Sequence, residues 1–183
     1  CGASESYGKN PEYLRYSAAH STIILQNTNI SEIKLGTPHK KFPQSVVFRK
    51  ESNSNQEIFE GSHNGYLSKF NKIIKRKLII HKDKNKLIGE DSIISYKKLN
   101  SRLIYHIRFH MAEGSSFNFT NSRKNVIIKT KLNNIWLFKS QNELIVEDSI
   151  LVDNNITKPT KQIVIKGIIT NKKIIKKWSL EKK

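Results

Sequence analysis

Short segments of alternating apolar and polar residues run along most of this chain, and they limit its fold more than any other feature. The clearest case is residues 102–110, where every second residue from Leu103 to Phe109 is apolar. Because side chains alternate between the two faces of a β-strand, this spacing predicts a strand with one buried face. No segment keeps the apolar spacing of a helix for three turns, although residues 68–77 fit either element.

The same reading predicts a series of short strands from Ser21 onward, separated by turn-forming residues such as 82–85 and 153–155. The predicted strands are residues 22–26, 44–49, 56–60, 65–70, 73–81, 86–91, 93–97, 102–110, 116–120, 125–131, 134–139, 143–151, 161–169 and 174–180. Without crossover helices, they predict an all-β fold, an antiparallel two-sheet β-sandwich of about 12–14 strands. We expect one domain over residues 1–183, with an entry loop at 1–19 and the sandwich at 20–183.

The chain is strongly basic, since its 183 residues include 33 Lys and Arg against 15 Asp and Glu, a formal net charge of +18. This excess is spread along the whole chain, and the aromatic-basic motifs of RNA-binding sheets are absent, so nucleic acid is not the expected partner. An acidic polysaccharide, or no partner at all, fits a basic surface equally well. No apolar run approaches the roughly 18 residues of a membrane-spanning helix, and no membrane span is expected.

The sequence does not begin with methionine. Its only methionine is Met111, so we expect a processed product or a fragment of a longer protein. The single cysteine, Cys1, excludes an internal disulfide. Cys1 followed by Gly2 also fits the lipidated end of a bacterial lipoprotein, but a disordered tether usually follows such an end, whereas strands soon follow here.

The familiar catalytic signatures are missing, because the sequence has no phosphate-binding glycine-rich loop, Gly-x-Ser-x-Gly, Cys-x-x-Cys or zinc-protease His motif. The residues alone favour a binding or structural module. His20 and His63 each stand where a loop enters a strand, and either a ligand site or an ordinary partly buried histidine fits that position. His106 and His110 lie about 13 Å apart on one strand face, too far to share a metal ion. With Arg108 they form either a cationic stripe or a solvated face.

Several motifs follow one another along the chain. The sequence begins with Cys1-Gly2-Ala3-Ser4-Glu5-Ser6-Tyr7-Gly8, continues with Arg15-Tyr16-Ser17-Ala18-Ala19-His20-Ser21-Thr22, and later contains Gly61-Ser62-His63-Asn64-Gly65-Tyr66. Residues 86–91, 107–110 and 160–167 add shorter pieces. In this order the motifs resemble heparinase II/III-type polysaccharide lyases over essentially the whole chain. Asn64 stands where the family has Asp, and Ser21 where it more commonly has Asn.

This resemblance implies that the chain is the C-terminal β-sandwich domain of a larger enzyme, whose N-terminal part is an α/α-toroid. Such enzymes cleave uronate-containing polysaccharides, heparin-like or alginate-like, by β-elimination in the cleft between the two domains. Their catalytic Asn, His and Tyr come from the toroid, and a further His comes from a His-x-His-x-Asp motif upstream of this chain. The resemblance therefore implies no catalytic residue in this fragment and no lyase activity of the isolated chain.

The resemblance also implies roles for individual residues. His20 would be one ligand of a structural zinc ion, whose other ligands lie upstream. Tyr7 and Arg15 would line the substrate cleft, with Arg15 pairing with a uronate or sulfate, and His63 and Tyr66 would face the substrate. The implied partners are an anionic polysaccharide and the toroid domain. The implied location is the periplasm or cell envelope of a bacterium.

Two other classes of function stay open on the sequence alone. A non-catalytic carbohydrate-binding or envelope-attached β-sandwich would bind glycans in a saturable, salt-sensitive way without any other domain. A nucleic-acid-binding protein would need Lys and Arg gathered on one side of the fold, with exposed aromatic residues between them.

Overall fold

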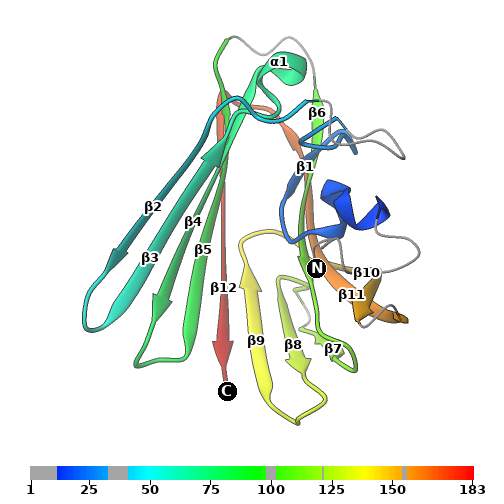
Figure 1. Cartoon of the computed structure of the whole chain (residues 1–183). Helices are drawn as coiled ribbons and strands as arrows, with labels where there is room; N and C mark the ends of the chain where they lie inside the picture. The colour runs from blue at the N-terminus through cyan, green and yellow to red at the C-terminus, as the bar shows by residue number, and fades with distance from the viewer. Residues whose placement is uncertain (1–11, 33–40, 98–101, 121, 154–155) are drawn as a thin grey trace.

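Two antiparallel β-sheets packed face to face form the chain in the computed structural model (Figure 1). The structure describes residues 12–32, 41–97, 102–120, 122–153 and 156–183, without the side chains of residues 12, 13 and 153. Every pairing between the described strands is antiparallel. No helix in these described ranges is long and apolar enough to cross a membrane. The predicted all-β, two-sheet sandwich is confirmed.

The large sheet has eight strands in the order β2-β3-β4-β5-β12-β9-β8-β7. These are β2 Val46–Ser52, β3 Gln56–His63, β4 Lys72–His81, β5 Lys86–Ser95, β7 Ser116–Phe119, β8 Asn125–Lys129, β9 Ile135–Ser140 and β12 Lys173–Lys182. β12 pairs with both β5 and β9, so the last strand of the chain joins two groups of consecutive strands. Asn85 and Asn133 occupy the predicted turns with left-handed φ values of 45° and 61°, which asparagine tolerates better than most residues.

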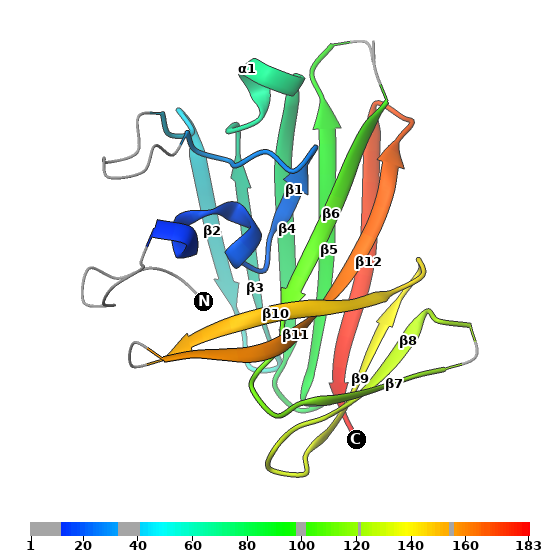
Figure 2. The same ribbon diagram turned by 90° about the vertical axis from the view of Figure 1, so that its right-hand side faces the viewer.

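The small sheet has four strands in the order β1-β6-β11-β10. These are β1 Ile23–Leu25, β6 Leu103–His110, β10 Ile145–Asp153 and β11 Ile156–Ile169. The segment before β1 forms two short 3₁₀ turns, η1 Glu12–Arg15 and η2 Ser17–Ala19, on the side of the small sheet that faces away from the large sheet (Figures 1 and 2). Leu14 and Ser17 of this segment are buried, so it packs as part of the domain.

Residues 65–70, predicted as a strand, form a turn and the short helix α1 Leu67–Phe70 instead. Gly65 packs directly against Ile30, and a Cβ atom at position 65 would lie 2.7 Å from Ile30 Cγ2. The helix ends at Asn71, which has a left-handed φ of 55°. A neighbouring loop and a helix cap therefore hold this backbone, and neither can be read from local apolar spacing.

Two other predicted strands differ in extent. Residues 86–91 and 93–97 belong to one continuous strand, β5, because Ser92 keeps the alternation and pairs with Lys75 and Ile175 on either side. β11 begins at Ile156, earlier than predicted, because its first residues pair with the end of β10. With the strand predicted at 65–70 replaced by α1 and these two segments merged, the described part of the chain has twelve strands, within the predicted number.

A buried ion pair lies between the sheets. Asp91 on β5 is 1% exposed, and its oxygens accept from Arg76 on β4 at 2.6 Å (Nε) and 3.0 Å (Nη2). Trp178 on β12 donates from Nε1 to the same carboxylate at 2.8 Å. Arg76 also donates to the carbonyl of Ser21 before β1, and its guanidinium lies 5.6 Å from the Phe109 ring centre on β6. The Asp91 carboxylate thus holds Arg76 in place, and Arg76 in turn contacts residues of the small sheet and of the segment before it.

Trp178 is also the centre of an aromatic cluster in the core. Its ring stacks on Phe138, with centroids 5.7 Å apart, and meets Phe109 at 4.7 Å with an edge-to-face tilt. It lies over Gly89, its cross-strand partner, where a Cβ atom would be 2.1 Å from the indole ring. Position 89 therefore requires glycine because of this close approach.

We predict that Asp91→Ala lowers the free energy of unfolding by about 3–5 kcal/mol, since it leaves the Arg76 guanidinium partly buried without its carboxylate partner. The neighbouring variant Glu90→Ala is the control, because Glu90 is 3.9 Å from Lys177 at a partly exposed position. Its cost should stay within about 1 kcal/mol. Denaturant unfolding followed by tryptophan fluorescence measures both, and equal losses would contradict the proposed importance of the pair.

Candidate functional site

Polar contacts hold the segment before β1 against the loop that follows β1 and against β6 of the small sheet. Ser17 donates its backbone N–H to Asn29 Oδ1 at 2.9 Å, and Ile30 donates its N–H to Ser17 Oγ at 2.8 Å. His110 Nε2 lies 3.0 Å from the carbonyl oxygen of Ala18 and must be the donor, because a carbonyl oxygen only accepts. The segment therefore has a fixed position on the domain.

His20, predicted as a metal ligand, lies at the end of η2 and is partly buried. Its Nε2 is 2.9 Å from the carbonyl oxygen of Leu14 and donates to it, so Nδ1 carries the lone pair of the neutral ring. In the described residues no group of three or more His, Cys, Asp and Glu side chains could hold a metal ion. A zinc ion at His20 would take its other ligands from elsewhere, and this role stays a prediction.

The two residues predicted to line the substrate cleft precede His20. Arg15 ends η1 and is partly buried, whereas Tyr7 lies outside the described residues.

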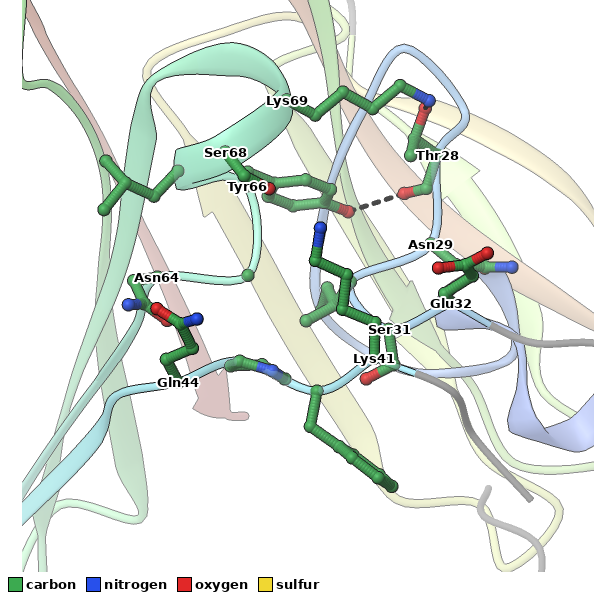
Figure 3. Close-up of a pocket in the computed structure, with 15 residues that line it drawn as sticks. Thr28, Asn29, Ser31, Glu32, Lys41, Gln44, Asn64, Tyr66, Ser68 and Lys69 are labelled. Atoms are coloured by element: carbon green, nitrogen blue, oxygen red, sulfur yellow. Dashed lines mark hydrogen bonds between the residues drawn. The ribbon is translucent and has the colours of Figure 1, made fainter.

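A pocket of about 620 Å³ opens at the end of the sandwich beside α1 (Figure 3). Three segments far apart in the sequence line it, residues 28–32 after β1, residues 41–44 before β2, and residues 64–69 around α1. We name it the α1 pocket.

Backbone contacts fix the walls of the α1 pocket. Ser45 donates its N–H to Asn64 Oδ1 at 3.0 Å, and Asn64 donates its own N–H to the carbonyl of Ser45 at 3.2 Å. Gly65 adds the close packing against Ile30 described above. The motif at residues 61–66 therefore builds one wall of the pocket, and Asn64, which replaces the family's Asp, has a positioning role there.

Charged groups give the α1 pocket a cationic character. Lys41 extends across it toward the ring of Tyr66, and Lys69 stands at the rim, with Nζ 3.5 Å from Thr28 Oγ1 (Figure 3). Glu32 supplies one carboxylate against these two ammonium groups. The other polar lining groups are neutral amides and hydroxyls, from Asn29, Ser31, Gln44, Asn64 and Ser68. Such a lining suits a ligand that carries an anionic group and several hydroxyl groups.

Tyr66 is part of the core beneath this pocket. The residue is 1% exposed, and its hydroxyl donates to the carbonyl of Thr28 at 2.7 Å (Figure 3). Burial raises the pKa of the Tyr66 hydroxyl well above its usual value, so it stays protonated. Its hydroxyl therefore braces the 28–32 loop against α1. The substrate contact predicted for Tyr66 stays a prediction.

His63, the last residue of β3, lines a smaller cavity of about 240 Å³ between β1 and strands β2–β4. Its Nδ1 accepts from the N–H of Gly65 at 3.2 Å, and its Nε2 is buried without a partner in the described structure. Burial lowers the pKa of the imidazole, so the neutral form is favoured. His63 and Tyr66 are thus neighbours, with ring centroids 6.0 Å apart, but His63 does not line the α1 pocket.

The histidines of β6 form neither an exposed cationic stripe nor a solvated face. His106 is 8% exposed, and Arg108 is largely buried and pairs with Glu147 on β10 at 2.9 Å. His110 is partly buried between Ala18 and Ser149. The segment before β1 and the side chains of β10 cover this face, and strand periodicity alone does not reveal that cover.

Sequence reasoning missed most of the α1 pocket. Residues 28–32 and 41–44 are short loop segments that carry no recognisable motif. Their approach to residues 64–69 depends on how β1 and β2 enter different sheets. Local spacing carries no information about that.

The fold and this pocket define an all-β sandwich domain with a polar, cationic site. The chain belongs to the family described as heparinase II/III-like, C-terminal, which matches residues 1–178. This confirms the resemblance seen in its motifs. A comparison with curated proteins finds no match in sequence.

Solved structures agree with the family at the level of the fold. The heparan sulfate lyase HepC from Pedobacter heparinus has a TM-score of 0.74 at 16% identity, over 94% of this chain and 25% of that chain. A structure described as heparinase III has a TM-score of 0.67 at 14% identity, over 100% of this chain and 26% of that chain. A heparinase III with methylated lysines gives 0.74 at 10% identity, over 97% of this chain and 27% of that one. The chain thus spans about a quarter of the length of these proteins.

We predict that Tyr66→Phe costs about 1–2 kcal/mol of stability, because it leaves the partly buried carbonyl of Thr28 without the Tyr66 donor. Oligosaccharide binding should stay within twofold of the wild type, because the hydroxyl already donates inside the protein. Thermal unfolding and titration calorimetry measure the two effects. A large loss of binding with little loss of stability would instead support a direct substrate contact.

We predict that the domain becomes less stable as the pH falls from 7 to 5. Burial lowers the pKa of His63 in the folded state, so near and below pH 6.5 the unfolded chain binds more protons than the folded one. Burial is also the largest cause that lowers the pKa of His106 and of His110. The slope can reach about 1.4 kcal/mol per pH unit for each proton. His63→Gln should flatten the measured dependence of unfolding free energy on pH, and an unchanged slope would argue against a buried neutral His63.

Proposed function

We propose that this chain is the C-terminal β-sandwich part of a polysaccharide lyase, and that the α1 pocket holds an anionic sugar residue of the glycan. The observation that carries the proposal is the placement of Lys41 and Lys69, against the single carboxylate of Glu32, around a pocket whose other polar groups are amides and hydroxyls. Membership of the heparinase II/III-like family supports a uronate-containing substrate. The Pedobacter heparinus neighbour is described as a heparan sulfate lyase, which agrees with an anionic polymer.

The two lysines supply charge at the surface of the pocket. Both side chains are exposed, so each contributes modestly and their attraction to a carboxylate or sulfate is screened by salt. The neutral amides and hydroxyls supply directional hydrogen bonds to the sugar, which orient the ring. In this assignment the pocket positions an anionic residue of the chain and does not carry out the chemistry.

The lyase reaction needs groups that the α1 pocket does not supply. In β-elimination the C5 proton of a uronate is removed, the C4–O4 bond breaks, a C4=C5 double bond forms and the leaving oxygen takes up a proton. We assign these steps to residues of a longer polypeptide. His20 could add its Nδ1 to a zinc site shared with that part. The proposed location is the periplasm or cell envelope of a bacterium, where such polymers are encountered.

The pocket is tested by removing its positive charge. Lys41→Ala and Lys69→Ala should each weaken binding of a hexuronate oligosaccharide about threefold, and the double variant about tenfold. Lys84→Ala, in the β4–β5 turn at the opposite end of the large sheet, is the matched control and should bind normally (Figure 1). Calorimetry at low and moderate salt gives the affinities. Equal binding by all variants would rule out the α1 pocket as the anionic site.

The proposal that this chain binds the glycan while catalytic residues lie elsewhere is tested with the chain alone. We predict that the 183-residue chain produces no unsaturated uronate, measured by ultraviolet absorbance, from heparin, heparan sulfate or alginate, although it binds uronate oligosaccharides. Product formation would overturn the assignment of catalysis to other residues. Salt-sensitive binding by the chain combined with inactivity of a longer natural polypeptide would favour a non-catalytic carbohydrate-binding module.

A further inference from the structure

Asn64 and Gly65, in the wall of the α1 pocket, are placed so that they can react with each other. Asn64 Cγ and the backbone nitrogen of Gly65 belong to adjacent residues, and a bond between these two atoms closes a five-membered ring. Ring closure of this kind gains from the enforced proximity of the two groups. Gly65 has no side chain to shield its nitrogen, and its close packing against Ile30 leaves no room for one.

His63 supplies a base for the Gly65 nitrogen. Gly65 donates its N–H to His63 Nδ1 at 3.2 Å, and this is the proton that the nitrogen must lose when it attacks. Burial lowers the pKa of the His63 imidazole, so the ring is neutral near pH 7 and Nδ1 keeps its lone pair. The ring proton is then on Nε2, which has no hydrogen-bond partner among the described residues. The imidazole is therefore in the protonation state that a base requires.

The side-chain amide of Asn64 is held and polarised at its oxygen. Ser45 donates its backbone N–H to Asn64 Oδ1 at 3.0 Å. A donor at this oxygen stabilises the negative charge that develops there when a nucleophile adds to Cγ. Asn64 Nδ2, the leaving group, makes no hydrogen bond in the described part of the chain. Because Asn64 lines the α1 pocket, ammonia can leave and water can enter there (Figure 3).

We propose that Asn64 is a self-modification site, converted by groups of the same chain into aspartate or isoaspartate through a cyclic imide. His63 takes the Gly65 N–H proton, the Gly65 nitrogen bonds to Asn64 Cγ, and the Cγ–Nδ2 bond breaks. The leaving nitrogen takes up the proton from His63 and departs as ammonia, so the imidazole is neutral again. Water then adds to either carbonyl of the imide and reopens the ring, which gives one carboxylate and one peptide bond.

The product changes the charge of the α1 pocket. Aspartate and isoaspartate both carry a carboxylate where Asn64 carries a neutral amide, so two carboxylates, with Glu32, then face Lys41 and Lys69. Binding of an anionic sugar residue therefore weakens as the protein ages. This consequence rests on the proposed function, whereas the modification itself needs no ligand.

The test follows position 64 in the 183-residue chain, kept near pH 7 either folded or unfolded in urea. Peptide mapping by mass spectrometry measures how fast aspartate and isoaspartate appear there. We expect conversion to be at least about tenfold faster in the folded chain, because the base and the donor to Asn64 Oδ1 are in place only in the fold. Conversion that is equal or slower in the folded chain overturns the proposal.

The role of His63 is tested by His63→Gln, which keeps an acceptor for the Gly65 N–H but removes the base. Conversion at Asn64 should slow by at least about tenfold. In the unmodified sequence the folded-state rate should level off once the imidazole is neutral, whereas the rate in urea should keep rising with pH. His81→Gln, at the end of β4, is the matched control and should convert normally. An unchanged rate in His63→Gln overturns the proposal.

The effect on the α1 pocket is tested separately with Asn64→Asp, which carries the carboxylate from the start. It should bind a hexuronate oligosaccharide about threefold more weakly than the wild type at low salt. Normal binding by Asn64→Asp, with weaker binding by Lys41→Ala and Lys69→Ala, overturns the effect on the pocket. If all three variants bind normally, the α1 assignment fails, while fast conversion that depends on His63 still supports the modification.

Discussion

The ion pair between Arg76 and Asp91 is the interaction on which the rest of this sandwich depends. A carboxylate in the space between two sheets is unfavourable unless each oxygen has a donor, and here Arg76 and Trp178 supply them. The same arginine reaches the backbone at Ser21 and the ring of Phe109. The position of β1 relative to the large sheet, and hence of the loop that follows β1, is therefore tied to one charged cluster.

The α1 pocket and its surroundings follow from that placement. The loop after β1 contributes Thr28, Asn29 and Ile30 to the α1 pocket, and the segment before β1 contributes Tyr16 and Ala18 to a second cavity beside β10. The α1 pocket gathers two lysines, whereas the lining of the second cavity includes no lysine or arginine among the described residues.

Much of the fold could be predicted because strand spacing is a local property. The alternation in β6 and the turn residues around Asn85 and Asn133 indicated strands and hairpins that the structure contains. The failure at 65–70 has a tertiary cause, since Gly65 packs against Ile30 from a loop some 35 positions earlier in the sequence. The motif at residues 61–66 was recognised from the sequence. The sequence did not show that Tyr66 lies in the core, that His63 is largely buried, or that Asn64 forms part of a pocket wall.

The sequence by itself determined the all-β class, the antiparallel strands and the family. The apolar alternation, the turn residues and the order of the motifs are properties of the sequence that need no knowledge of tertiary contacts. Only the tertiary structure decided which polar residues meet. Arg76 and Asp91 become a buried pair, His106 and Arg108 lose the exposure that their positions suggested, and Lys41 and Lys69 converge on one pocket. The physical reason is that such contacts depend on how the sheets are ordered and stacked, which brings together residues between 15 and 87 positions apart.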